Sequence, residues 1–296
     1  MRYGRTSGLW YLNWDGRDFG SLMKYHGDTT MSTVQEKLRE VGIDSLAILD
    51  TSEKKPHEEG RDIIYTGDPR EDAYTLSEFL SENVTMPYYV EIPYYKYRSD
   101  TPRGPDYWKR WVEVFMRSSY YNLRGFYWNY ECPMMFEAKA VGASWETVIS
   151  ELANRIHEAG FEFIWIPHVH TTSEDDIKSL RVFNSGKSYN HHAAYYFDWV
   201  FLQPNYYQGK LLPANSDTLK QWKEYVDNAK KNLRNYRGVD NIYYMFECDG
   251  AVLTNPVYRQ RACDYVQVLG KPPRRAYYYD VRVEALEYLK GVCDYV

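Results

Sequence analysis

The run Gly125-Phe126-Tyr127-Trp128-Asn129-Tyr130-Glu131 starts as an aromatic, strand-like segment and ends in a carboxylate. A second run has the same design: Ile242-Tyr243-Tyr244-Met245-Phe246-Glu247-Cys248-Asp249. Aromatic and β-branched residues favour strands. Parallel barrels place their chemistry at the carboxyl ends of their strands, so acids in these positions predict an active site.

These two runs are the fourth and seventh of eight strand-like runs, which are Leu9–Trp14, Ser45–Asp50, Tyr88–Pro93, Gly125–Tyr130, Phe163–His168, Trp199–Asn205, Ile242–Glu247 and Arg275–Asp280. Between them, apolar residues recur at helical spacing, as at Val148, Leu152 and Ile156. Alternating strands and amphipathic helices predict parallel strands inside a layer of helices. We therefore predict an α/β fold, a single (β/α)8 or TIM barrel over residues 1–296.

Helix ends and connections complete this scheme. Ser32 with Gln35 and Thr75 with Glu78 have the spacing of capping boxes, which predicts helix starts there. Several connections are long for simple βα-loops and predict an extended mouth at the carboxyl end of the barrel; they are Thr51–Asp72, Tyr94–Gly104, Cys132–Ala143, Thr171–Phe197 and Gln208–Ser216.

The amino-acid composition argues against some classes of binding partner and location. The net charge is -5 and the lysines and arginines are scattered, so nucleic acid is not an expected partner. No apolar window is long enough to span a membrane, so we expect a soluble protein, either cytoplasmic or secreted after loss of a signal peptide. The four cysteines show neither a metal-binding pair nor a disulfide framework, and we expect mostly free thiols: Cys132, Cys248, Cys263 and Cys293.

Side-chain alternation gathers polar residues at one end of the predicted barrel. Residues two apart on a strand share a face, which groups Asn129 with Glu131 and Glu247 with Asp249. The same argument collects Asn13, Asp15, Asp50, Glu91, His168, His170, Gln203, Asn205, Tyr278 and Asp280. Such groups are costly to desolvate unless paired, so function explains them better than stability. For Asp50 and Asp280, capping of the following helix is an equal alternative.

Two carboxylates at the mouth of a barrel suit glycoside hydrolysis, in which one acid protonates the leaving oxygen and the other attacks or activates water. We predict Glu131 as the acid or acid/base and Glu247 as the nucleophile or base, with Asp249 as the substitute. Asn129, Gln203, Asn205 and Tyr206 are expected to bind sugar hydroxyls. The chain has 31 tyrosines and 9 tryptophans, and Trp14, Trp128 and Tyr207 are candidates to stack on sugar rings.

The motifs resemble known families. Trp128-Asn129-Tyr130-Glu131 on a fourth strand and Glu247 on a seventh resemble clan A retaining glycosidases, although Tyr130 separates the asparagine from the acid. The chain from Leu9 to Asp280 is also similar to an uncharacterised bacterial barrel family, domain-of-unknown-function family 4855, in the runs Gly125–Trp128, Phe163–Pro167, Phe201–Tyr206 and Glu247-x-Asp249. Both resemblances imply a glycosidase with a carbohydrate substrate, and the resemblance to clan A implies a retaining mechanism.

Two alternatives stay open. His168 and His170, with Asp280, Glu131 and either His191 or His192, fit the ligand types of a metal-dependent hydrolase. The barrel could instead bind glycans without cleaving them. The preferred hydrolase interpretation needs no cofactor and no metal, and it leaves open the sugar, its linkage, the stereochemistry and the oligomeric state.

Overall fold

The computed structural model describes residues 6–14, 18–50, 68–93, 104–117, 121–131, 145–184 and 192–296. The strands in these ranges are β1 (Thr6–Trp14), β2 (Phe19–Ser21), β3 (Ser45–Asp50), β4 (Tyr88–Ile92), β5 (Leu123–Trp128), β6 (Glu162–Trp165), β7 (Trp199–Leu202), β8 (Ile242–Glu247) and β9 (Arg275–Tyr278).

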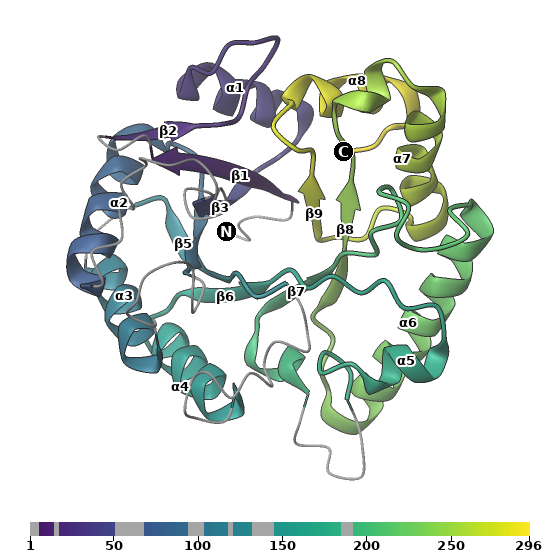
Figure 1. Cartoon of the computed structure of the whole chain (residues 1–296). Coiled ribbons are helices and arrows are strands. Elements are labelled where there is room, and N and C mark those ends of the chain that lie inside the picture. Colours follow the sequence, from purple (N-terminus) through teal and green to yellow (C-terminus); the bar gives the residue numbers. More distant parts are fainter. Residues whose placement is uncertain are drawn as a thin grey trace, which may run out of the picture.

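A closed parallel barrel forms the centre of the molecule. Strands β3 to β9 pair in chain order, β1 pairs with β3, and β1 also pairs with β9, which closes the ring. All of these pairings are parallel. Strand β2 adds to β1 as an antiparallel hairpin outside the ring. Figure 1 shows the strands surrounding the barrel axis. The predicted TIM barrel is therefore confirmed.

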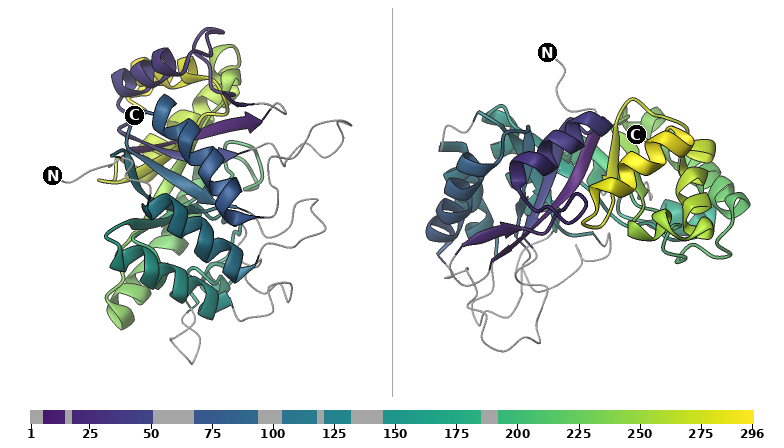
Figure 2. Two further views of the ribbon diagram at one scale, coloured as in Figure 1. Left: turned by 90° about the vertical axis from the view of Figure 1, so that its left-hand side faces the viewer. Right: turned by 90° about the horizontal axis from the view of Figure 1, so that it is seen from above.

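Helices cover the outside of the barrel (Figures 1 and 2). In the described ranges they are α1 (Met31–Val41), α2 (Pro69–Asn83), α3 (Pro105–Arg117), α4 (Trp145–Glu158), α5 (Glu174–Ser179), η4 (Ala193–Tyr196), α6 (Ser216–Arg237), η5 (Gly250–Leu253), α7 (Pro256–Leu269) and α8 (Val283–Cys293). Each long helix turns an apolar stripe toward the strands, as Val148, Leu152 and Ile156 do on α4.

The core has two layers because the strands are apolar on both faces. Alternate residues fill the barrel interior, among them Leu49, Tyr127, Ile164 and Met245. The residues between them pack outward against the helices, and β3 is buried along its whole length. Strands buried on both faces are characteristic of parallel sheets. The inner layer lies directly below the polar residues at the carboxyl ends of the strands.

Two predicted helix starts are wrong. Helix α1 begins after Thr30. The Gln35 side chain donates to Met31 O at 3.1 Å and Asn83 O at 2.8 Å, and it accepts from Thr85 N at 2.8 Å and Met86 N at 3.1 Å. Helix α2 begins after Asp68, whose side chain accepts from Arg70 N at 2.8 Å. Thr75 lies inside that helix and donates its hydroxyl to Glu71 O at 3.0 Å. A threonine that bonds the previous turn has no capping role.

The expectation of free thiols is wrong for two of the cysteines. Cys263 on α7 and Cys293 at the end of α8 form a disulfide across a sequence separation of 30 residues. Both residues lie on neighbouring helices that pack together, which brings their Cα atoms to 5.8 Å. Cys248 is a buried free thiol, as predicted. Cys132 lies outside the described residues.

Much of the predicted mouth lies outside the described residues, namely 51–67, 94–103, 132–144 and 185–191. The extended βα-loops therefore stay a prediction. In the part of the chain that the structure does describe, no helix combines the length and the apolar character needed to cross a bilayer.

Candidate functional site

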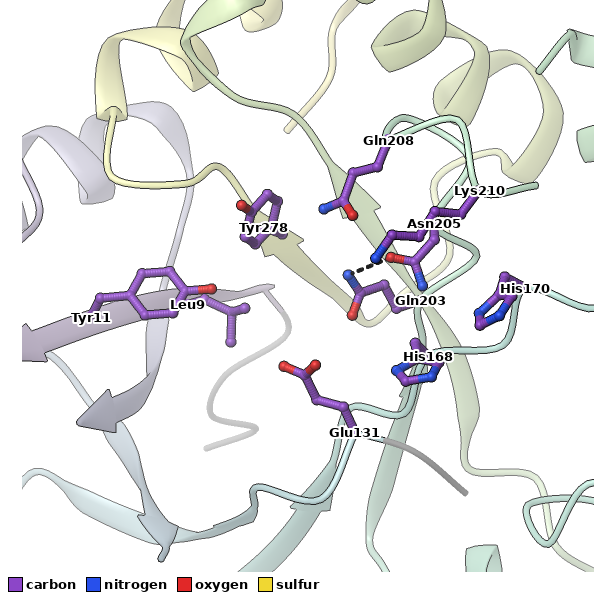
Figure 3. Close-up of a pocket in the computed structure, with 10 residues that line it drawn as sticks. All are labelled: Leu9, Tyr11, Glu131, His168, His170, Gln203, Asn205, Gln208, Lys210 and Tyr278. Carbon is purple, nitrogen blue, oxygen red and sulfur yellow. Dashed lines mark hydrogen bonds between the residues drawn. The ribbon is translucent and has the colours of Figure 1, made fainter. Parts of the chain in front are cut away.

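A polar cavity of about 240 Å³ opens at the carboxyl end of the barrel strands (Figure 3). Its described lining comes from β1, β9 and the segments that follow β5, β6 and β7, and consists of Leu9, Tyr11, Glu131, His168, His170, Gln203, Asn205, Gln208, Lys210 and Tyr278. Six of these ten residues are among the site residues predicted from the sequence. Side-chain alternation along the strands therefore predicted which of these residues share one end of the barrel.

Glu131 is the carboxylate at this cavity within the described lining. It directly follows the end of β5, where the backbone N–H of His168 donates to its carbonyl oxygen at 2.8 Å and fixes the chain. In Figure 3 the carboxylate points into the cavity between Tyr11 and Gln203. Burial raises the pKa of Tyr11, and the charges of Tyr278 and Glu131 raise it further, so the Tyr11 hydroxyl stays protonated beside the acid.

Glu247 ends β8 and lies below the cavity surface, with 0% of its area exposed. Its Oε1 accepts from Gln203 Nε2 at 3.0 Å, and its Oε2 accepts from the hydroxyl of Tyr265 on α7. Burial raises the pKa of Glu247 to about 7, although the hydrogen bonds from Tyr265 and Gln203 and the charge of Lys210 act in the opposite direction. Desolvation therefore dominates at this carboxyl.

We expect Glu247→Gln to remove a pH dependence of stability. The pKa of about 7 compares with an ordinary value of 4.5, so the folded state holds this proton more tightly than the unfolded chain. The resulting stability is fully present below the unfolded pKa and is lost as pH rises through 7. Between about pH 5 and pH 9, the free energy of unfolding of the wild type should fall by roughly 2–3 kcal/mol relative to the variant. Urea unfolding at several pH values in this range measures the free energy of unfolding of both proteins. The same dependence of that free energy on pH in the two proteins would contradict the prediction.

Gln203 has one preferred amide orientation. Its Nε2 donates both to Glu247 Oε1 at 3.0 Å and to Asn205 Oδ1 at 3.3 Å (Figure 3 shows the second bond). An amide nitrogen has two hydrogens, and these two bonds use both. Gln203 therefore offers its Oε1 as an acceptor to the cavity, while Asn205 offers its Nδ2 as a donor. Such a pair suits a hydroxyl, which both donates and accepts.

Glu91 connects three strand ends below the mouth. Its Oε1 accepts from the backbone N–H of Asp50 at 2.6 Å, and its Oε2 accepts from Asn129 Nδ2 at 2.6 Å. All three residues are buried, with 5% or less of their area exposed. The described lining of the cavity contains none of them. Their contacts support the positions of β3, β4 and β5 and hence of Glu131, which follows Asn129 by two residues.

The histidines lie on one wall of the cavity. His168 and His170 stack with ring centroids 5.2 Å apart. Burial lowers the pKa of His168, and the neighbouring His170 and Lys210 lower it further, so this ring is neutral at neutral pH. Within the described ranges, no group of three or more His, Cys, Asp or Glu side chains is arranged to hold a metal ion. His191, one ligand of the metal alternative, lies outside those ranges.

Several predicted ligand contacts are wrong because the side chains are core residues. Trp128 is 2% exposed and packs against Trp108 and Tyr130 on the outer face of the barrel. Tyr206 and Tyr207 are each 1% exposed, and their hydroxyls donate to Asp264 at 2.5 Å and Asp249 at 2.6 Å. Neither ring is available to a sugar in this arrangement.

The other predicted site residues that the structure describes are not part of the described cavity lining. Asp249 caps η5 by accepting from Ala251 N at 2.7 Å, and its substitute catalytic role stays a prediction. Asp280 follows β9 with a left-handed backbone, φ 52°, and burial raises its pKa. Asn13 pairs with Gly20 in the β1–β2 hairpin. Asp15 and the side chain of Trp14 lie outside the part of the chain that the structure describes.

The sequence did not predict four residues of the cavity lining, Leu9, Tyr11, Gln208 and Lys210, nor Tyr265 behind Glu247. Tyr11 lies two residues from both Leu9 and Asn13, so strand alternation could have found it. Gln208 and Lys210 reach the cavity from the segment after β7, where no regular periodicity indicates direction. Tyr265 reaches Glu247 from the middle of α7, 18 residues later in the chain. A contact between a helix and a strand end leaves no signal in one sequence.

Comparisons with known proteins define the relatives of the chain. No family model matches it, so membership of the family proposed from its motifs stays a prediction. An uncharacterised protein of Methanocaldococcus jannaschii is 24% identical over 279 residues, with 76% of each chain covered.

Solved structures with the same general shape include enzymes of different chemistry. Type I 3-dehydroquinate dehydratase from Clostridium difficile has a TM-score of 0.47 at 10% identity, with 100% of this chain and 94% of that chain covered. The endocellulase from Pyrococcus horikoshii has a TM-score of 0.47 at 11% identity, covering 92% and 83%. The chitinase from Chromobacterium violaceum has a TM-score of 0.45 at 11% identity, covering 96% and 98%.

Proposed function

We propose that this barrel is a glycoside hydrolase in which Glu131 is the acid or acid/base. One observation carries the proposal: Glu131 points into a polar cavity at the carboxyl end of the barrel, facing Tyr11 and the Gln203 amide. Barrel enzymes build their active sites at this end. A carboxyl group in such a position can donate a proton to a leaving glycosidic oxygen and, in a retaining reaction, recover it from water.

Glu247 is the second carboxylate of the proposal, as nucleophile in a retaining reaction or as base in an inverting one. It lies directly beneath Gln203, which covers its Oε1. Attack on a sugar requires the Gln203 amide to turn away from Glu247, an exchange that a substrate hydroxyl accepting from Gln203 Nε2 would favour. The pKa of about 7 adds a condition, because Glu247 is fully ionised only above neutral pH. Turnover through this carboxylate should therefore increase between about pH 6 and pH 8.

The other cavity residues suit a sugar. Tyr11 and Tyr278 supply aromatic faces with hydroxyl groups, and the amides of Gln203 and Asn205 supply an oriented acceptor and donor. Lys210 and the two histidines add donors on the opposite wall. This mixture of flat apolar faces and hydrogen-bonding groups matches the C–H patches and hydroxyls of a pyranose ring.

Incubation with a panel of aryl glycosides and polysaccharides tests the proposal, with release of reducing ends as the readout. We expect hydrolysis of at least one glycan, and proton NMR of the first product gives the anomeric configuration. Retention would support covalent attack by Glu247, and inversion would support its action as a base. A wild type that releases no product from any glycan would end the proposal.

The burial of Glu247 specifically favours a second candidate, a glycan-binding barrel without catalysis. Both of its oxygens are occupied by Gln203 and Tyr265, and its exposed area is 0%. If that arrangement persists with sugar bound, the cavity has no second carboxylate from the described residues. Glycan binding detected by calorimetry, without product release over days, would favour this candidate.

A further inference from the structure

A second hollow lies on the outside of the barrel, between α2 and α3. Its volume is about 420 Å³, larger than the cavity at the mouth. The two helices pack side by side, as Figure 1 shows at the left of the molecule. We call this hollow the arginine groove; it is lined by Arg70, Glu71, Tyr74, Arg110, Glu113, Val114 and Arg117. It shares no described lining residue with the cavity.

The arginine groove carries a local positive charge on an acidic protein. Arg70, Arg110 and Arg117 are exposed, and within the described residues none of their guanidinium groups has an ion pair or a hydrogen bond. Glu113 is neutralised by an ion pair with Arg155 of α4. Three positive charges therefore face one unpaired acid, Glu71, although the whole chain has a net charge of -5. Such a concentration of unpaired guanidinium groups attracts anions.

The spacing of the arginines favours a ligand with repeated negative charges. Arg110 and Arg117 lie seven residues apart on α3, which is about 10 Å along the helix axis. Arg70 lies on the other wall, in the first turn of α2. One small anion cannot easily satisfy groups distributed over this length, whereas a chain with a carboxylate on successive units can pair with each. Guanidinium binds carboxylate through two parallel hydrogen bonds.

Tyr74 adds a feature that favours a sugar polymer over other polyanions. It lines the groove together with the arginines, and 52% of its area is exposed. An exposed aromatic ring beside charged donors suits a pyranose, whose C–H face stacks on the ring while its substituents reach the charges. Helix α2 also begins after β3, so its first turn with Arg70 lies at the mouth end of the barrel. A polymer bound here can extend toward the mouth.

We propose that the arginine groove is a binding site for an acidic polysaccharide, one whose sugar units carry carboxylates. The choice of a sugar polymer rests on the proposed function of the cavity. In this arrangement the groove holds part of the polymer on the flank of the barrel, and the cavity acts on another part. The groove itself makes no contact with the reacting bond.

Calorimetric titration with polygalacturonate, and with dextran as an uncharged polymer, tests the site in the full chain. The variant is R110Q/R117Q, and the matched control is R234Q/R237Q, which removes the same charge from exposed arginines of α6. We expect the wild type to bind polygalacturonate and not dextran, R110Q/R117Q to lose at least about tenfold in affinity, and the control to stay within about twofold. Tyr74→Ala should also weaken binding.

Three results would overturn the site: no binding of polygalacturonate by the wild type, equal losses in the variant and the control, or equally tight binding of double-stranded DNA at matched charge. Circular dichroism establishes that both double variants are folded. Binding is measured without turnover, and an aryl glycoside reports on the cavity alone. Binding of the polymer without hydrolysis of any glycan would support the groove and contradict the proposed glycosidase. Hydrolysis of a glycan without binding of polygalacturonate would contradict only the groove.

Discussion

Glu131→Gln should lower kcat about a thousandfold on any substrate that the wild type hydrolyses, because general acid–base catalysis commonly contributes factors of this size. The amide keeps the size of the side chain but cannot donate a proton at neutral pH. Glu131 is only partly buried and follows β5 without supporting the core, so the fold should be unchanged. An aryl glycoside with a good leaving group should recover part of the rate, since it needs little protonation.

The matched control is Glu158→Gln, which makes the same chemical change at an exposed position at the end of α4. Its kcat should equal that of the wild type. Thermal unfolding of both variants should superimpose on that of the wild type. Near-normal turnover by the Glu131 variant would remove this residue from the mechanism and would leave Glu247 without its proposed partner.

Removal of the Cys263–Cys293 bond should give the largest loss of stability, roughly 3.5 kcal/mol, as estimated from the entropy of closing a loop. The loop is defined by a sequence separation of 30 residues. Chemical denaturation of C263S/C293S under non-reducing conditions measures the loss. Each single variant should lose about as much as the double variant, because either change opens the same loop.

Cys248→Ala is the contrasting variant. It removes a buried thiol but opens no disulfide-closed loop. The wild type treated with a reductant should unfold at the same denaturant concentration as C263S/C293S, and the reductant should leave that variant unchanged. If reduction does not move the midpoint of the wild type, α7 and α8 are held together by packing alone. The disulfide also lies on the helix that carries Tyr265, two residues after Cys263, so Glu247 is expected to lose part of its hydrogen-bonded shell when α7 loosens.

The sequence predicts the barrel well because its strands are buried and its helices are amphipathic. Ser45–Asp50 and Ile242–Glu247 coincide with β3 and β8, and the other six predicted runs overlap the strands found. The hairpin strand β2 was missed because three residues are too few for a periodic signal. The start of α2 was misplaced because Thr75 with Glu78 imitates a capping box from inside the helix, whereas Asp68 before Pro69 is the actual cap.

The positions of the candidate site residues were predictable where strand geometry decides the direction of a side chain. Alternation placed Glu131, His168, Gln203 and Tyr278 at the mouth, and the structure brings them together in one cavity. It could not show that Gln203 covers Glu247, since that depends on the depth of each residue below the surface. The disulfide likewise depends on how α7 and α8 pack, and two cysteines without a spacing motif do not encode it.

The pairing of β1 with β9 has a consequence for how the chain folds. Thr6 lies opposite Arg275, so the ring is completed by strands from opposite ends of the sequence. This contact is the most non-local in the barrel and carries a large entropy cost of closure. During synthesis, the edge of β1 at Thr6–Gly8 stays unpaired until β9 has been made. A product that stops before Arg275 would expose edges on both β1 and β8, and such edges promote aggregation through strand addition.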